Sequence, residues 1–185
     1  MDRIKLHDKY FVPFIPHEQI IKAIDQVAGK INDDFKESAD VPLIVCVLNG
    51  SIIFTGELMQ RLEFTCELTS IRVSSYQGTS STGQIKQIIG LQNNIAGRRA
   101  IIVEDIVDTG ATIVDLKNKL LEAGASEVRI CTMLFKEEVY KQSIKLDYVG
   151  IRIPNKFIVG FGLDYDQIGR NTKDIYILES QESNS

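Results

Sequence analysis

Three acidic residues, Glu104, Asp105 and Asp108, lie within a stretch of five in this chain. They follow the apolar segment 100–103 and are followed by Thr-Gly-Ala-Thr at 109–112, where a helical pattern begins. A loop of small residues at a helix start directs backbone N–H groups and hydroxyls at one point near the positive end of the helix dipole, which suits a phosphate. The flanking acids suit a divalent cation or sugar hydroxyls. The pattern therefore predicts a site for an anionic, metal-associated sugar phosphate.

An ordinary strand-to-helix connection with a threonine N-cap would produce the same local pattern. Two features favour a ligand site. Three carboxylates this close repel one another unless a cation or a substrate donor lies between them. The continuously apolar segment 100–103 is typical of a strand buried on both faces, and open α/β sheets bind ligands at the C-terminal ends of such strands.

The composition is typical of a soluble globular protein, with 44% hydrophobic and 25% charged residues among 185. This length fits one domain, residues 1–185. The net charge of −4 argues against a general nucleic-acid binder. We expect no membrane segment, because no apolar run reaches about 18 residues, and the charged N-terminus is unlike a signal peptide. Three cysteines stand singly among apolar residues, which predicts reduced thiols and a cytoplasmic protein.

The hydrophobic pattern predicts strands that alternate with helices. Helical spacing covers 16–36, 52–62 and 112–123. Strands are predicted at 43–48, 65–73, 87–91, 99–104, 127–135, 148–153, 157–161 and 174–178. This order predicts an α/β fold, a mainly parallel twisted sheet with helices on both faces. We expect a core at about 37–146, a small cap from about 1–15 and 147–178, and a mobile polar lid at 74–84.

Four blocks of sequence stand in an order that resembles the type I phosphoribosyltransferase family. They are Leu-Asn-Gly-Ser at 48–51, Ser-Ser-Tyr at 74–76, the acidic segment at 103–112, and Ile-Pro-Asn-Lys-Phe-Ile-Val-Gly-Phe-Gly-Leu-Asp-Tyr at 153–165. The acidic segment is similar to the family's phosphoribosyl-pyrophosphate signature. The last block narrows the resemblance to the hypoxanthine and hypoxanthine–guanine branch.

The resemblance implies a purine salvage transferase. Such an enzyme joins a 6-oxopurine base to phosphoribosyl pyrophosphate, with Mg²⁺, to give IMP or GMP and pyrophosphate. By resemblance, Glu104 and Asp105 hold the ribose hydroxyls and the metal, and Asp164 anchors a metal beneath the base. The 5′-phosphate lies in the loop formed by Asp108, Thr109, Gly110, Ala111 and Thr112. Asp108 is also implied to be the catalytic proton acceptor at purine N7.

The remaining roles are also implied by the resemblance. Pyrophosphate is bound by Leu48, Asn49, Gly50 and Arg170, and we predict a cis peptide bond between Leu48 and Asn49. The purine is bound by Lys136, which donates to its 6-oxo group, by the stacked ring of Phe157, by the backbone of Ile158, and by Asp164. Ser74, Ser75 and Tyr76 belong to the lid. Relatives form dimers and tetramers, so we expect a homodimer or homotetramer without nucleic-acid or membrane partners.

Several alternatives stay open at this stage. Residues 49–50 also fit a plain Asn-Gly turn, and Lys136 fits a solvated lysine. Asn49 stands where some relatives carry a basic residue, and the Lys-Pro-x-Arg-Arg run of the family is missing after residue 135, where Lys141 is a candidate replacement. Two functions compete with this one: a regulator with this fold that binds nucleic acid, and a xanthine-preferring transferase.

Overall fold

Among the residues that the structure describes, the larger of two sheets contains six strands. The computed structural model describes residues 2–37, 40–75, 85–89 and 94–179. The strand order is β5 (Ile85–Ile89), β4 (Glu67–Ser75), β3 (Leu43–Leu48), β6 (Arg99–Val107), β7 (Glu127–Phe135) and β8 (Tyr148–Arg152). The five strands β4, β3, β6, β7 and β8 run parallel, and the edge strand β5 is antiparallel to β4. The predicted parallel sheet is confirmed.

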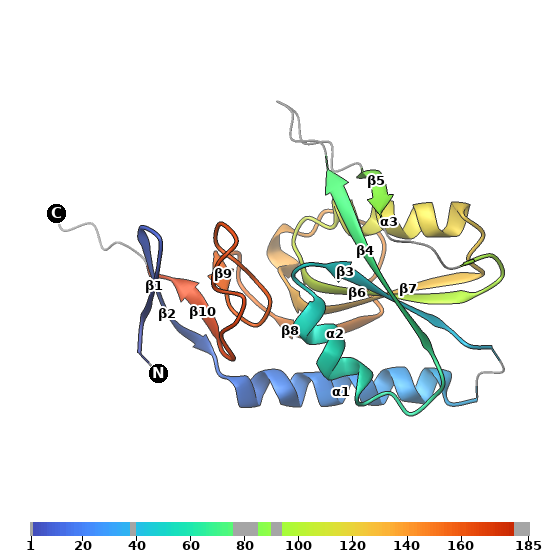
Figure 1. Cartoon of the computed structure of the whole chain (residues 1–185), viewed down its shortest axis with the longest axis horizontal. Helices are drawn as coiled ribbons and strands as arrows, with labels where there is room; N and C mark the ends of the chain where they lie inside the picture. The colour runs from blue at the N-terminus through green and yellow to red at the C-terminus, as the bar shows by residue number, and fades with distance from the viewer. Residues whose placement is uncertain (1, 38–39, 76–84, 90–93, 180–185) are drawn as a thin grey trace.

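Helices cover both faces of this sheet (Figure 1). Helices α1 (His17–Phe35) and α2 (Ile52–Met59) lie on one face, and α3 (Ala111–Glu122) lies on the other. Ile44 and Ile101 pack into the apolar cluster under α1 and α2, whereas Val45 and Ile102 pack into the cluster under α3. Successive strand residues point to opposite faces, so burial on both faces requires the continuous apolar runs seen in the sequence.

The smaller sheet lies at one end of the molecule (Figure 1). Its order is β1 (Ile4–Leu6), β2 (Lys9–Ile15), β10 (Ile175–Leu178) and β9 (Ile158–Val159), and all its pairs are antiparallel. The sequence pattern did not predict β1 and β2 as strands. Pro13 in β2 cannot donate a ladder hydrogen bond and so argues against a central strand, yet β2 lies between β1 and β10.

A hydrogen bond joins the smaller sheet to the core. The N–H of His17 donates to Asp174 Oδ1 at 2.7 Å. Pro16, the residue before α1, makes no side-chain cap, so the carboxylate from the far end of the chain satisfies one of the unpaired N–H groups at the helix start.

The structure shifts several predicted boundaries, and two of these shifts affect the smaller sheet and the cap. Strand β8 pairs in parallel with β7, so the larger sheet extends to Arg152 and includes residues expected in the cap. The strand predicted at 157–161 is reduced to β9, because Gly160 and Phe161 have φ angles of 101° and 49°, which strands do not adopt. The hydrophobic pattern of the sequence shows neither the pairing of β8 with β7 nor the backbone conformation at 160–161.

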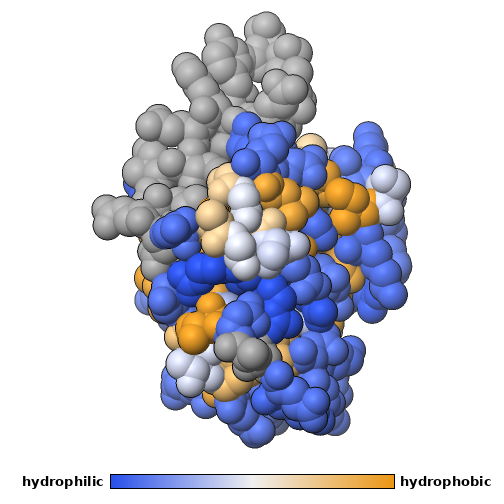
Figure 2. All heavy atoms as spheres, turned by 90° about the vertical axis from the view of Figure 1, so that its right-hand side faces the viewer, coloured by the Kyte–Doolittle hydropathy of each residue, from blue (hydrophilic) through white to orange (hydrophobic). Residues whose placement is uncertain are grey.

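The surface at the end away from the smaller sheet is largely hydrophilic, with hydrophobic residues in small groups between polar ones (Figure 2). Within the described ranges, no helix combines the length and apolar character needed to cross a membrane.

Candidate active site

The predicted phosphate loop surrounds a small cavity at the C-terminal end of β6. The cavity measures about 130 Å³ and is lined by Glu104 and residues 106–113. Gly110 precedes α3 with a φ of 81°, and no side chain caps the helix start. The first N–H groups of a helix have no acceptor within it, so they can bind an anion here. The structure therefore brings together Glu104 and the predicted residues 108–112.

The loop at 140–142 supports the phosphate loop, and the sequence had singled out only Lys141 in it, as a replacement for the missing basic residues. The N–H of Lys141 donates to the carbonyl of Thr109 at 3.2 Å, and Gln142 Nε2 donates to the same carbonyl at 3.3 Å. A Cβ at Gly110 would overlap the ring of Tyr140. Glycine is therefore required at this position for space as well as for its backbone conformation.

Glu104 and Asp105 form a half-buried pair of acids. Glu104 Oε1 accepts the N–H of Asp105 at 3.1 Å, and Asp105 Oδ1 accepts the N–H of Ile106 at 2.8 Å. Burial raises the pKa of Glu104 well above its ordinary value, and the charge of Asp105 adds to the effect. Burial also raises the pKa of Asp105, and this effect is partly offset by hydrogen bonds with Glu104 and the backbone and, to a smaller extent, by the charge of Arg170. Two desolvated carboxylates with too little positive charge nearby are suited to receive a hard cation.

Asp164 has hydrogen-bond and ion-pair partners of its own. Its Oδ1 pairs with Arg170 Nη2 at 2.7 Å, and its Oδ2 accepts the N–H of Gln167 at 2.9 Å. Nowhere in the described ranges do three or more His, Cys, Asp or Glu residues gather as a metal cage. This arrangement fits Mg²⁺, which usually takes one or two carboxylates and completes its shell with water and substrate phosphates.

The predicted pyrophosphate loop follows β3. The peptide bond between Leu48 and Asn49 is cis, as predicted. A Cβ at Gly50 would overlap the carboxylate of Asp105, so the loop backbone lies directly against the acid pair. Arg72 of β4, which the sequence did not single out, donates from Nη2 to Asn49 Oδ1 at 3.1 Å. The sequence carries no signal for this contact, because it depends on the pairing of β3 with β4.

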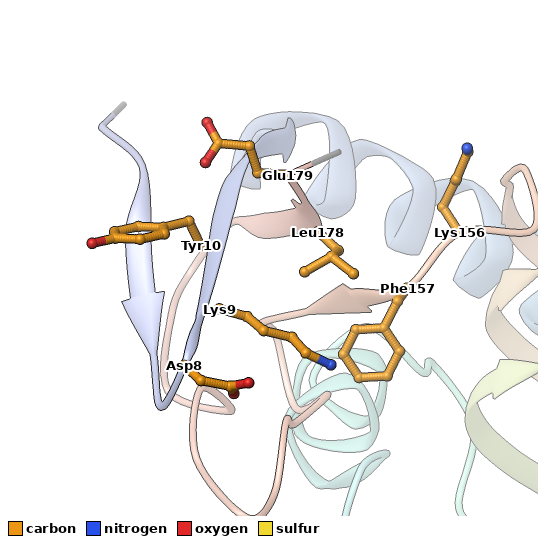
Figure 3. A pocket seen from close by; sticks show the side chains of 7 residues that line it. All are labelled: Asp8, Lys9, Tyr10, Lys156, Phe157, Leu178 and Glu179. Carbon is orange, nitrogen blue, oxygen red and sulfur yellow. The ribbon is translucent and has the colours of Figure 1, made fainter. Parts of the chain in front are cut away.

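The predicted purine-binding residues come from both sheets. Lys136 is 9% exposed, and its ammonium lies 3.3 Å from Asp108 Oδ2. Ile158 is buried in β9, an edge strand of the smaller sheet. Phe157 is 44% exposed and borders a cavity of about 430 Å³ on this sheet. Figure 3 shows the Lys9 ammonium beside this ring, and Lys9 Nζ is 6.0 Å from the ring centroid.

The predicted lid is only partly described. Ser74 and Ser75 are the last residues of β4, which pairs antiparallel with β5. Tyr76 and the remainder of the predicted lid, residues 77–84, lie outside the described residues.

Comparison with known proteins identifies the family. Residues 15–166 match the phosphoribosyl transferase domain. The hypoxanthine-guanine phosphoribosyltransferase of Streptococcus thermophilus is 38% identical over 165 residues, which are 89% of this chain and 91% of that protein. The enzyme of the same name from Lactococcus lactis is 37% identical over 171 residues, 92% of each chain. This chain belongs to the hypoxanthine-guanine phosphoribosyltransferase family.

Solved structures agree with this assignment. A hypoxanthine phosphoribosyltransferase from Staphylococcus aureus superposes with a TM-score of 0.84 at 32% identity, covering 90% of each chain. The hypoxanthine phosphoribosyl transferase of Trypanosoma cruzi gives a TM-score of 0.85 at 31% identity, covering 95% of each chain. The chain is thus an enzyme with the type I phosphoribosyltransferase fold.

Arg170 lies between the loop after β9 and the acid pair of this phosphoribosyltransferase. Its Nη1 donates to the carbonyl of Gly162 at 2.7 Å while Nη2 pairs with Asp164, and its charge acts on Asp105. A Cβ at Gly162 would overlap the carbonyl oxygen of Gly50. The loop after β9 therefore packs backbone to backbone on the predicted pyrophosphate loop. The charge of Arg170 acts on both Asp164 and Asp105.

Proposed function

We propose that this chain transfers the phosphoribosyl group of phosphoribosyl pyrophosphate to hypoxanthine and guanine, releasing pyrophosphate. The observation that carries the proposal is the Lys136–Asp108 pair, 3.3 Å apart, beside a helix start without a side-chain cap. A 6-oxopurine presents an N–H at N7 and an oxygen on C6 along one edge. One carboxylate acceptor and one ammonium donor side by side complement that edge.

The sugar phosphate occupies the loop after β6 in this proposal. The N–H groups of 110–113 and the hydroxyls of Thr109 and Thr112 bind the 5′-phosphate. Glu104 and Asp105 bind the ribose hydroxyls. Binding the sugar from two sides holds C1 in line with the attacking nitrogen. The loss of translational and rotational freedom then occurs on binding, which lowers the entropic part of the activation barrier.

Departure of pyrophosphate requires neutralisation of its charge. The loop 48–50 and Arg170 are the groups proposed to hold it. Mg²⁺, held by Glu104 and Asp105 with Asp164 nearby, supplies Lewis-acid stabilisation of the leaving group when bound. The raised pKa values of the acid pair support this assignment, because both carboxylates gain from a neighbouring cation.

Asp108 accepts the N7 proton as the new bond forms. Its side chain is about half exposed and its neighbour Lys136 is buried, so the base reaches both groups from the solvent side. Lys136 also selects the base. It donates to the 6-oxo oxygen but faces the amino group of adenine with a second donor, which leaves a buried ammonium without its acceptor.

A spectrophotometric assay tests the proposal. The protein is incubated with Mg²⁺ and phosphoribosyl pyrophosphate together with hypoxanthine, guanine, xanthine or adenine in turn. We expect turnover with hypoxanthine and guanine and little with adenine. Turnover with xanthine at the higher rate would reassign the base, and no turnover with any of the four would refute the proposal. Chelation of Mg²⁺ is expected to abolish the reaction, and restored Mg²⁺ to recover it.

A further inference from the structure

Arg72 places a guanidinium beside the loop 48–50. In the parallel pairing of β3 with β4, Arg72 lies opposite Leu48, the last residue of β3. Its neighbour Ile71 is buried, whereas Arg72 itself is exposed. The alternation of a strand therefore turns Arg72 away from the core, and its Nη2 reaches Asn49 Oδ1 at 3.1 Å.

The charge balance around the site makes this arginine unusual. Lys136 is paired with Asp108, and Arg170 is paired with Asp164. Within the described residues, the recorded partner of Arg72 is the neutral amide oxygen of Asn49, and no ion pair involves it. A guanidinium carries five N–H donors, so the Asn49 contact leaves most of them available. Because the Asn49 amide is neutral, it leaves the positive charge of the Arg72 guanidinium uncompensated and able to attract an anion.

Pyrophosphate is a ligand that suits this position. We propose that Arg72 is a further binding residue for the pyrophosphate group and that Asn49 positions it. This inference rests on the proposed function, which puts pyrophosphate on the loop 48–50. Arg72 binds oxygen atoms of the leaving group from the β4 side, opposite the cation that Glu104 and Asp105 would hold. The planar guanidinium can bind two such oxygens at once.

The test separates pyrophosphate binding from binding of the rest of the substrate. The KM for phosphoribosyl pyrophosphate and for hypoxanthine, and the inhibition constant of inorganic pyrophosphate with Mg²⁺, are measured for wild type, Arg72→Gln and Arg72→Lys. For Arg72→Gln we expect the constants for pyrophosphate and phosphoribosyl pyrophosphate to rise about tenfold, the size of one charge-assisted hydrogen bond. The dissociation constant of IMP, which has no pyrophosphate, and the KM of hypoxanthine should stay unchanged. Arg72→Lys should fall between, because it keeps the charge and loses the planar geometry.

Arg3→Gln is the matched control. It removes the same charge at an exposed position just before β1, where Arg3 pairs with Glu179, and should leave every constant unchanged. If Asn49 acts by holding Arg72, Asn49→Ala combined with Arg72→Gln should weaken pyrophosphate binding no more than Arg72→Gln alone. Independent, additive losses would overturn the positioning role of Asn49.

Two results would overturn the role of Arg72: an unchanged pyrophosphate constant in Arg72→Gln, or an equal loss for IMP and hypoxanthine. Calorimetric titration of Mg²⁺ and inorganic pyrophosphate into wild type and Arg72→Gln tests this role without turnover. Failure of the proposed function, seen as no transfer to any base, is thereby distinguished from failure of this inference.

Discussion

The ammonium of Lys136 lies 3.3 Å from the Asp108 carboxylate, although 28 residues separate them in the chain. The backbone brings them together, because the N–H of Lys136 donates to the carbonyl of Val107 at 3.0 Å where β6 and β7 end. In the absence of a base each group neutralises the other. A 6-oxopurine gives each group a new partner, so the two side chains together form a recognition unit for the base.

Asp108→Asn should lower turnover by about 10²–10⁴-fold, the range of a general base, while binding of phosphoribosyl pyrophosphate stays within a few-fold. The amide keeps the shape of the side chain but does not accept a proton at N7. Steady-state kinetics with hypoxanthine and calorimetric titration of phosphoribosyl pyrophosphate measure the two quantities. Unchanged turnover would remove Asp108 from the catalytic role.

Lys136→Ala should raise the KM for hypoxanthine by at least about tenfold and reduce the discrimination against adenine. The substitution removes the donor to the 6-oxo group and also the ammonium that opposes an amino group. The relative kcat/KM for the two bases measures the effect. Lys119→Ala is the control: Lys119 is a partly buried lysine of α3 that pairs with Asp115, and this variant should behave like wild type. An unaltered preference in Lys136→Ala would contradict the assignment.

Gly50→Ala and Gly162→Ala should each lower the free energy of unfolding by about 1–3 kcal/mol and reduce activity together with stability. A methyl group at 50 would displace the Asp105 carboxylate, and one at 162 would press on the carbonyl of Gly50, with the added cost of a φ of 101°. Gly29→Ala is the matched control, since Gly29 is an exposed residue of α1 with no heavy atom near its added Cβ. It should raise stability by up to about 1 kcal/mol. Urea unfolding measures all three, and equal effects at 29 and 162 would refute the packing argument.

Glu104→Gln should stabilise the protein at high pH. A carboxyl whose pKa is raised by folding imposes no penalty below its unfolded pKa. As the pH rises from the unfolded pKa to the raised pKa, the folded state must ionise a half-buried carboxyl, and stability is lost. Above the raised pKa the loss is constant. The variant lacks this loss, so its Tm should match that of wild type near about pH 4 and exceed it by a few degrees at about pH 8. For a chain of this size, about 1 kcal/mol corresponds to roughly 2–4 °C in Tm.

Thermal denaturation across this pH range measures the difference. The same variant should bind Mg²⁺ and phosphoribosyl pyrophosphate more weakly, because it loses an anionic oxygen ligand. A lower Tm than wild type at pH 8 would show that burial of the Glu104 charge does not oppose folding.

The amino-acid sequence by itself determined the features that depend on neighbours along the chain. The apolar run before Glu104 predicted a strand buried on both faces, and the glycine-containing loop at 109–112 predicted a helix start suited to a phosphate. Both follow from side-chain periodicity and from the backbone preferences of small residues, which act over a few positions. The order of four short blocks was enough to indicate the family, and the cis bond at Leu48–Asn49 came with that resemblance.

Only the tertiary structure decided the contacts between distant segments. Sheet order and register place Arg72 beside Asn49, and the crossing of Gly162 over Gly50 sets the smaller sheet on the core. The pairing of β2 with β10 was hidden from the sequence as well, because β2 contains a proline and β10 comes from the opposite end of the chain. Periodicity records how deeply a segment is buried but not which segment covers it. Residues whose roles depend on a partner far along the chain are therefore visible only once the strands have been paired.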